Sequence, residues 1–204
     1  MIIHKLLVGS LFLSCLLSAG CMTTPPKNPE NLCAIFKEKP SWYRSIKRSE
    51  KRWNVQAPMI MSVLYRESSY VKNAKPPRTK LLGLVPWRRP SSAFGFAQAT
   101  NETWLDYRKA TGRRFADRDD FGDAVDFVGW YLDRSSRTLG INRNDAKQLY
   151  LSYHEGLSGY RSGSWRKKTW LLGAATKVQN KNRLYSQQLA SCRKSLNRKR
   201  WLFF

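Results

Sequence analysis

Two cysteines near opposite ends of the chain, Cys33 and Cys192, constrain its fold more than any other feature. A bond between them would close nearly the whole domain into one loop and bring its first and last elements side by side. The other two cysteines, Cys15 and Cys21, belong to the N-terminal region. Whether the distant pair is joined depends on the compartment, and two separate buried thiols are the alternative.

The N-terminal region has the pattern of an export signal. An apolar run from Leu6 to Leu17 follows a short basic start and leads through small residues to Cys21. The run is shorter than the roughly 20 residues that span a bilayer comfortably. The stretch Leu17–Cys21 resembles a bacterial lipobox, so we predict a lipoprotein signal peptide over residues 1–20 and a lipid on Cys21. An ordinary secretory signal or an uncleaved anchor is the alternative. Export in turn favours the disulfide.

The rest of the chain divides into three predicted parts. Residues 21–31 are rich in Thr, Pro and Asn and are predicted to form a flexible tether between lipid and domain. Residues 32–197 have the length of one domain with a proper core. Residues 198–204 combine cations with aromatic residues, as interfacial membrane segments do, although a solvated tail is the alternative.

The same region predicts where the protein resides. No Asp follows Cys21, and by resemblance to enterobacterial sorting patterns we expect a lipid-anchored protein of the outer membrane that faces the periplasm. The membrane would then be one partner, reached through the lipid on Cys21. Nothing in the sequence indicates a coiled coil or a large exposed apolar stripe, so we expect a monomer.

The chain is strongly basic, with a formal net charge of +23 that falls only to +22 when the signal, which contains Lys5, is removed. Its partner should therefore be strongly anionic. Nucleic acid, anionic lipid and cell-wall polymers all fit, but an exported protein meets the last two, so no nucleic-acid partner is expected. His154 is the only histidine of the mature chain, and zinc-finger spacing and a Gly-rich phosphate loop are absent from the sequence. We therefore expect no metal, no cofactor and no Ser-His-Asp triad.

Apolar residues recur at helical spacing through most of the chain, and β-branched alternation is scarce, so we expect a mainly α domain. The predicted helices cover Ser41–Trp53 with Ser41 as N-cap, Pro58–Glu67, Asp123–Leu139, a helix that begins at the N-cap Asn144 and includes Tyr153, Trp165–Val178 and Asn182–Leu196. Residues 72–94 interrupt this pattern, because they contain several prolines and, among them, five cations. We predict a long basic loop here, with at most a minor β-hairpin. Such a loop could cover a groove or touch a membrane, and disorder is the alternative.

Glu67 is the acidic residue in the least expected place. It follows Ile60, Val63 and Leu64 at helical spacing, so its carboxyl group should lie at the end of an apolar helical stripe. Burial disfavours the charged form and raises the pKa of a carboxyl group, which suits a general acid near neutral pH. On periodicity alone, a carboxylate at the edge of a groove, paired with a Lys or Arg, is the alternative.

Three sequence blocks, in this order, resemble the SLT-type lytic transglycosylases, a lysozyme-like family. Arg66–Tyr70 resembles the Glu-Ser pair at the end of their catalytic helix, Ala93–Gln98 their Gly-x-x-Gln motif, and Ser152–Gly156 their Ala-Tyr-Asn-Ala-Gly motif. Arg183–Tyr185 is a fourth candidate. The resemblance extends from about Trp53 to Tyr185 and implies a lysozyme-like helical domain that binds the glycan strands of peptidoglycan.

The resemblance also implies a role for each matched residue. Glu67 would be the catalytic acid and base, and Ser68 would make a polar contact beside it. Gln98 would donate a hydrogen bond to an N-acetyl or hydroxyl group of the sugar, and Tyr153 would line the groove. His154 would replace Asn as a hydrogen-bonding residue, and the hydroxyl of Tyr185 would reach the catalytic carboxyl group. Loop capping is the alternative for Gln98, and plain aromatic core is the alternative for Tyr153 and Tyr185. Gly95 is expected to allow a tight turn where the backbone approaches the substrate.

The implied reaction cleaves the β-1,4 bond between N-acetylmuramic acid and N-acetylglucosamine without water and leaves a 1,6-anhydromuramyl end. It needs one carboxyl group, whereas the usual glycosidase needs two. Besides His154 in place of Asn, two further departures from the family pattern are evident. Gln98 follows Glu67 by 31 residues, a longer gap than usual, and Glu155 stands where Ala is expected and could supply a second carboxylate. A hydrolytic muramidase of the same fold and a non-catalytic lipoprotein that binds the wall or other polyanions are therefore the alternatives.

Overall fold

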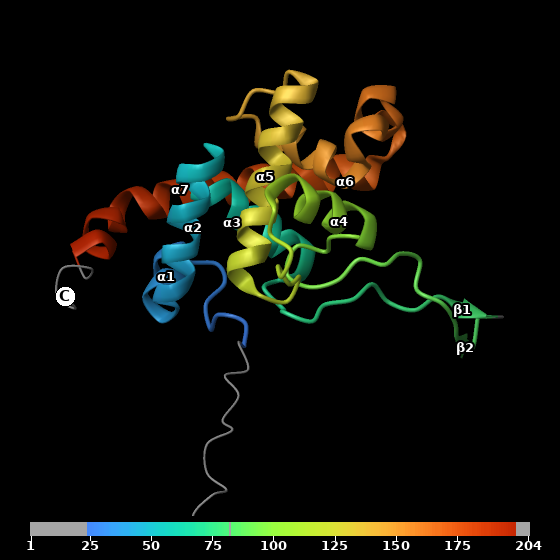
Figure 1. The fold of residues 1–204 in the computed structure, drawn as a ribbon, viewed down its shortest axis with the longest axis horizontal. Helices are drawn as coiled ribbons and strands as arrows, with labels where there is room; N and C mark the ends of the chain where they lie inside the picture. Colours follow the sequence, from blue (N-terminus) through green and yellow to red (C-terminus); the bar gives the residue numbers. More distant parts are fainter. Residues whose placement is uncertain (1–23, 82, 199–204) are drawn as a thin grey trace, which may run out of the picture.

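The computed structural model describes residues 24–81 and 83–198, and Figure 1 shows them as a helical body from which one narrow hairpin projects. The predicted signal peptide, the lipidation site Cys21 and the tail beyond Arg198 lie outside the described residues. No helix in the described part of the chain is long and apolar enough to cross a bilayer.

The described chain is mainly helical, which confirms the predicted fold class. Its helices are α1 (Leu32–Glu38), α2 (Pro40–Trp53), α3 (Ala57–Ser68), α4 (Asn101–Thr111), α5 (Phe121–Leu139), α6 (Ala146–Ser162), the short 3-10 helix η1 (Ser164–Lys167) and α7 (Thr169–Arg198). Two antiparallel strands of two residues each, β1 (Lys80–Leu81) and β2 (Val85–Pro86), form the minor hairpin that was predicted within residues 72–94.

Helix α3 forms the centre of the core. Every residue from position 57 to position 64 is buried, so the first two turns of this helix have no solvent-facing side. A helix that is apolar all round must be covered on all sides. Helices α5 and α7 provide most of this cover, and α2 contributes further contacts.

The helix ends differ from prediction in detail. Pro40 opens α2, one residue ahead of the predicted cap Ser41, because a proline at the first helical position loses no hydrogen bond. Helix α6 is capped by Asp145, whose carboxylate accepts a hydrogen bond from the backbone N–H of Gln148 at 3.0 Å, and not by the neighbouring Asn144. Helix α7 is continuous where two segments were predicted, and α1 and α4 were not predicted.

An aromatic cluster joins α2, α5 and the segment that precedes α4. Trp42 of α2 stacks on Phe121 of α5 with ring centroids 3.7 Å apart and an angle of 6° between the planes. Phe96 packs edge-on against both rings, at 5.8 Å and 5.4 Å. This contact fixes the segment around Phe96 against the helical core.

Asp126 anchors α5 from the other side. Its carboxylate accepts hydrogen bonds from the indole N–H of Trp53 at 2.8 Å, from the hydroxyl of Tyr107 at 2.8 Å and from Arg52 at 3.0 Å. Arg113 lies within 3.4 Å of the same group. A buried charge with this many partners holds three helices in register, because removing any partner leaves it poorly compensated.

The predicted disulfide is present, with Cys33 of α1 bonded to Cys192 of α7 across 159 residues of sequence. It lies beside the core, which runs from Leu32 to Leu196. Residues 24–198 therefore contain the described core and the bond that closes it, and this segment has the contacts needed to fold by itself.

The segment just before α1 is bound to the domain. Tyr65 donates a hydrogen bond to Glu30 at 2.6 Å, Glu30 also pairs with Lys181, and the hydroxyl of Tyr185 donates to the carbonyl of Pro29. Asn31 caps α1. Pro29 and Glu30, within the predicted tether of residues 21–31, are therefore held against α3 and α7 by these contacts.

The disulfide yields a first prediction. Replacing both Cys33 and Cys192 with serine should lower the free energy of unfolding by about 2–5 kcal/mol, because the bond restricts a very long loop in the unfolded chain. Urea denaturation of residues 24–198 measures this change. Reductant should destabilise the wild type by a similar amount and leave the double variant unchanged. Equal midpoints for the wild type with and without reductant would contradict the prediction.

Candidate active site

A cleft of about 410 Å³ gathers side chains from four parts of the chain. The end of α3, the segment that leads into α4, the middle of α5 and the second half of α6 all contribute. Its lining residues are Glu67, Ser91, Ala93, Gln98, Ala99, Thr100, Thr103, Phe127, Tyr131, Tyr153, His154, Glu155 and Gly156. The structure therefore brings together residues from all three sequence blocks that resemble the transglycosylase motifs.

Two larger hollows lie elsewhere on the described surface, at about 670 Å³ and 510 Å³. The first lies between α2 and the start of α5 and is lined by ion-paired Arg, Lys and Asp side chains. The second lies between α3 and α7. Neither is lined by Glu67, so the smaller cleft is the better candidate for chemistry.

Glu67 is the most unusual group of this cleft. Its Oε1 is shielded from solvent and accepts no hydrogen bond from any residue that the structure describes. Burial raises the pKa of Glu67 from its ordinary 4.5 to about 7, although a hydrogen bond from Tyr150 and the charge of Arg66 partly oppose this effect. The carboxyl group is therefore largely protonated at slightly acidic pH and can both give and take a proton near neutrality.

Tyr150 is the functional neighbour that the sequence did not identify. It lies on α6, one helical turn before Tyr153, and it hydrogen-bonds to Glu67. Burial, reinforced by the nearby carboxylate, raises the pKa of the Tyr150 phenol, so this group stays a hydrogen-bond donor. The spacing of one turn was the available signal, because residues three apart share a helix face.

The segment from Gly95 to Ala99 forms one wall of the cleft. Gly95 has φ +79°, and a Cβ there would lie 2.1 Å from the backbone carbonyl oxygen of Arg118. Glycine is therefore required by its positive φ and by close contact with this neighbouring loop. Gln98 lines the cleft, but its Nε2 donates hydrogen bonds of 2.9 Å to the carbonyls of Ala74 and Gly95. The amide nitrogen of Gln98 therefore caps the loop, which was the alternative prediction for this residue.

Two side chains expected near the sugar hold this wall by its carbonyl groups. Ser68, predicted to make a polar contact beside Glu67, donates a hydrogen bond of 2.8 Å to the carbonyl of Phe96 and does not line the cleft. Tyr153 donates one of 2.5 Å to the carbonyl of Ala97 and also lines the cleft, as predicted. The end of α3 and the middle of α6 therefore set the position of the wall between them.

His154 and Glu155 both line the cleft, where the family pattern has Asn and Ala. Glu155 accepts hydrogen bonds from Lys168 at 2.9 Å and 2.8 Å, one on each oxygen, and from Ser164 at 2.7 Å. Nδ1 of His154 lies 3.2 Å from Glu155. Although burial works in the other direction, these hydrogen bonds hold the pKa of Glu155 below its usual range. Gly156 has φ +74° and breaks the helix directly after this pair.

Tyr185 is placed differently from the prediction. Its side chain is fully buried, does not line the cleft, and has its hydroxyl 3.0 Å from that of Tyr70 and bonded to the carbonyl of Pro29. The predicted contact of Tyr185 with the carboxyl group of Glu67 is therefore wrong, and the hydroxyl that bonds to this group belongs to Tyr150. The alternative of plain aromatic core describes Tyr185 correctly, because α7 turns this residue toward the N-terminal segment.

The two acidic side chains of the cleft, Glu67 and Glu155, have hydrogen-bond partners that are not acidic. No cluster of three or more His, Cys, Asp and Glu side chains within residues 24–81 and 83–198 is arranged to hold a metal ion. Glu67 has the phenol of Tyr150 as its hydrogen-bond partner, and Glu155 has the amine of Lys168.

Comparison with known proteins points to the same family as the three sequence blocks. A family model described as transglycosylase SLT domain matches residues 9–192. No curated protein and no solved structure shows a significant match.

The raised pKa of Glu67 yields a second prediction. In the folded protein this pKa is about 7 and its ordinary value is 4.5, so the folded state holds the proton more tightly than the unfolded state. Relative to Glu67→Gln, the wild type should be most stable below pH 4.5 and should lose roughly 3 kcal/mol as the pH rises through 7. Urea unfolding of both proteins across this pH range measures the difference. Parallel stability curves would show that Glu67 titrates normally.

Proposed function

The chain belongs to the transglycosylase SLT domain family, and from this premise we propose that it is a peptidoglycan lytic transglycosylase in which Glu67 is the catalytic acid and base. The substrate is the glycan strand, cleaved between N-acetylmuramic acid and N-acetylglucosamine. The observation that carries the proposal is a carboxyl group of raised pKa, with one unpartnered oxygen, in a cleft lined by the family's motif residues.

The reaction begins with the proton that burial keeps on Glu67. This proton passes to the glycosidic oxygen as the bond to C1 of N-acetylmuramic acid breaks, and N-acetylglucosamine leaves with a free hydroxyl group. Positive charge then develops at C1, where the carbonyl oxygen of the sugar's own N-acetyl group can stabilise it. A protein nucleophile is therefore not needed on this path.

The same carboxyl group completes the reaction as a base. The carboxylate of Glu67 removes the proton from the 6-hydroxyl of the same sugar, and this oxygen bonds to C1. The product is a 1,6-anhydromuramyl end, no water is consumed, and Glu67 regains its proton for the next cycle. A pKa of about 7 suits both halves of the cycle, because a group that titrates near the working pH both donates and accepts protons readily.

The state of Glu155 supports this path over hydrolysis. A second carboxyl group in a hydrolytic enzyme must act as a nucleophile or must activate water. Both oxygens of Glu155 accept hydrogen bonds from Lys168, and one also accepts from Ser164. A carboxylate stabilised in this way is a weak base. Its presence in the cleft nevertheless makes a hydrolytic muramidase the second candidate function.

We propose that the enzyme acts at the cell envelope. Lipidation of Cys21 would anchor it to the outer membrane with the cleft in the periplasm, where the wall is the nearest polymer. The mature charge of +22 favours a substrate that carries lactyl and peptide carboxylates. We propose that it acts there as a monomer.

A third prediction tests the reaction directly. Residues 24–198 should release fragments with 1,6-anhydromuramyl ends from purified peptidoglycan, and Glu67→Gln should release at least about a thousandfold less, because it keeps the shape of the side chain and removes the proton. Mass spectrometry identifies the ends, since an anhydro end is lighter than a hydrolysed end by one water.

Glu155→Gln is the matched control for this experiment. It should still release anhydro ends, and so would show that one carboxyl group is enough. Reducing ends from the wild type that disappear in Glu155→Gln would instead establish the hydrolytic muramidase. Wall binding without any release by the wild type would leave a non-catalytic binding protein.

A fourth prediction concerns Tyr150. Because its hydrogen bond lowers the pKa of Glu67, Tyr150→Phe should raise that pKa by roughly one unit. The alkaline limb of kcat/KM against pH, measured on soluble glycan fragments, should move upward by the same amount. Tyr160→Phe, which removes a hydroxyl bonded to Gln148 on the same helix, should leave the profile in place. An unchanged alkaline limb in Tyr150→Phe would disprove the positioning role of this hydroxyl.

A further inference from the structure

Residues 75–94 form a long hairpin arm. In the sequence the arm lies between the helix that carries Glu67 and the wall of the cleft, but in the structure it projects away from both. At its base the backbone N–H of Gly95 donates a hydrogen bond of 3.0 Å to the carbonyl of Ala74. The chain thus leaves the body and returns to the same place, and the extra residues between Glu67 and Gln98 do not disturb the cleft. Figure 1 shows the arm reaching well beyond the helices, with β1 and β2 at its far end.

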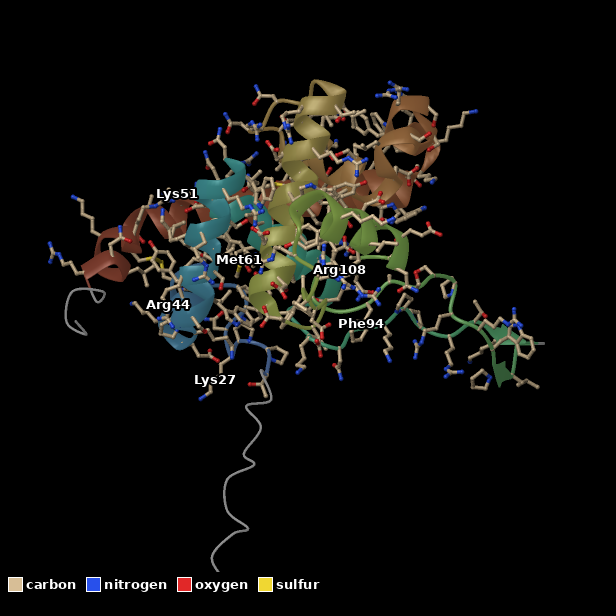
Figure 2. The ribbon with its side chains drawn as sticks, viewed as in Figure 1. Lys27, Arg44, Lys51, Met61, Phe94 and Arg108 are labelled. Atoms are coloured by element: carbon tan, nitrogen blue, oxygen red, sulfur yellow. A yellow bond between two sulfur atoms is a disulfide. The ribbon has the colours of Figure 1, made fainter. Side chains whose placement is uncertain are left out.

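The two sides of the arm are tied together along its length. Arg89 bonds to the carbonyl of Pro76 near the base, and Thr79 exchanges backbone hydrogen bonds with Trp87 and Arg88 at 2.6 Å and 3.0 Å. The antiparallel pair β1 and β2 closes the tip. Figure 2 shows Phe94 where the arm joins the body and side chains extending into solvent along the rest of it. The arm is therefore a built element that makes little use of its side chains for folding.

The charge of the arm has one sign. Among its 20 residues it carries five cations and no acidic residue. These are Lys75, Arg78, Lys80, Arg88 and Arg89, and all five are exposed. A surface of this kind attracts an anionic partner over a distance of about a Debye length.

The tip of the arm is apolar as well as exposed. Leu84 is 82% exposed and Trp87 is 48% exposed, and the guanidinium of Arg88 lies 5.9 Å from the Trp87 ring. The sequence from Leu81 to Trp87 contains no polar side chain. Exposed Trp and Leu side chains flanked by cations are the composition of segments that lie in a membrane interface.

We propose that this arm docks on the surface of an anionic lipid bilayer, with Leu84 and Trp87 entering the interfacial region and the cations meeting lipid phosphates. Trp favours the level of the headgroups, and Lys and Arg near the surface add electrostatic attraction. A glycan strand or a nucleic acid would satisfy the cations but would leave Leu84 in water, so the combination selects lipid.

Docking at the arm has a consequence for the cleft. Ser91 and Ala93, the last part of the arm before the body, line the cleft that contains Glu67. A membrane contact at the tip would therefore hold the cleft at a set height above the bilayer, no more than about 30 Å away, which is the reach of about nine extended residues. The arm would restrict which layer of the wall the cleft meets.

The test uses residues 24–198, which contain neither the lipid site nor the C-terminal tail. This protein should sediment with vesicles of phosphatidylglycerol and phosphatidylcholine and much less with phosphatidylcholine alone. The tip variant Leu84→Asp with Trp87→Ala, and the charge variant Lys80→Gln with Arg88→Gln, should each bind about tenfold more weakly or worse. All four side chains are exposed, so both variants should keep the fold and the disulfide.

Matched controls change the same chemistry on the body. Phe115→Asp removes an apolar side chain that is 98% exposed, and Lys109→Gln with Arg161→Gln removes two exposed cations. Both controls should bind vesicles as the wild type does. Brominated lipid should quench part of the tryptophan fluorescence of the wild type, and this part should be absent in Trp87→Phe.

Equal vesicle binding by the tip variant and the wild type would overturn the proposal. So would a tip variant that loses binding to purified peptidoglycan or lipopolysaccharide while its binding to vesicles is unchanged, because the arm would then serve a wall polymer. Vesicle binding does not depend on catalysis, and release of anhydro ends from soluble glycan does not require docking. Failure of this proposal and failure of the proposed function are thus separate results.

Discussion

The burial of α3 is the constraint on which the rest of the structure depends. Its first two turns have no side that water can reach, so α5 and α7 must cover them and the helix can emerge only at its end. Glu67 lies at that end, where desolvation is still strong but a cleft begins. The same packing that stabilises the domain therefore raises the pKa of its most reactive group, and no neighbouring acid is needed to explain that shift.

The motif residues act mainly on one another. Ser68 and Tyr153 each donate to a carbonyl of the segment that contains Gln98, and Gln98 in turn donates to the base of the arm. The position of the cleft wall is thus set from α3, from α6 and from the arm at once. The side chains of the motifs thus make hydrogen bonds that position the wall of the cleft. The hydrogen bond to Glu67 comes from Tyr150, which lies outside the motifs.

Sequence reasoning succeeded where a local pattern has a physical cause. The apolar stripe that ends in Glu67 correctly predicted a carboxyl group of raised pKa, and the prolines of residues 72–94 correctly predicted a break with a small hairpin. It failed where the outcome depends on distant partners. Tyr185 was assigned to the carboxyl group of Glu67 through the family resemblance, and a short motif does not say which neighbour a side chain meets across the core. Helix α4 was missed because only Trp104 and Tyr107 bury their side chains, which is too few to produce a stripe.

The disulfide gives the arm an unusual topology. Because Cys33 and Cys192 are bonded, the backbone between them, including the arm, forms part of a covalent ring. A single nick in the exposed arm would open this ring without releasing either piece, and the helices on both sides of the nick would still share one core. After such a cut, only the combined loss of the disulfide and of the shared core would separate the two halves.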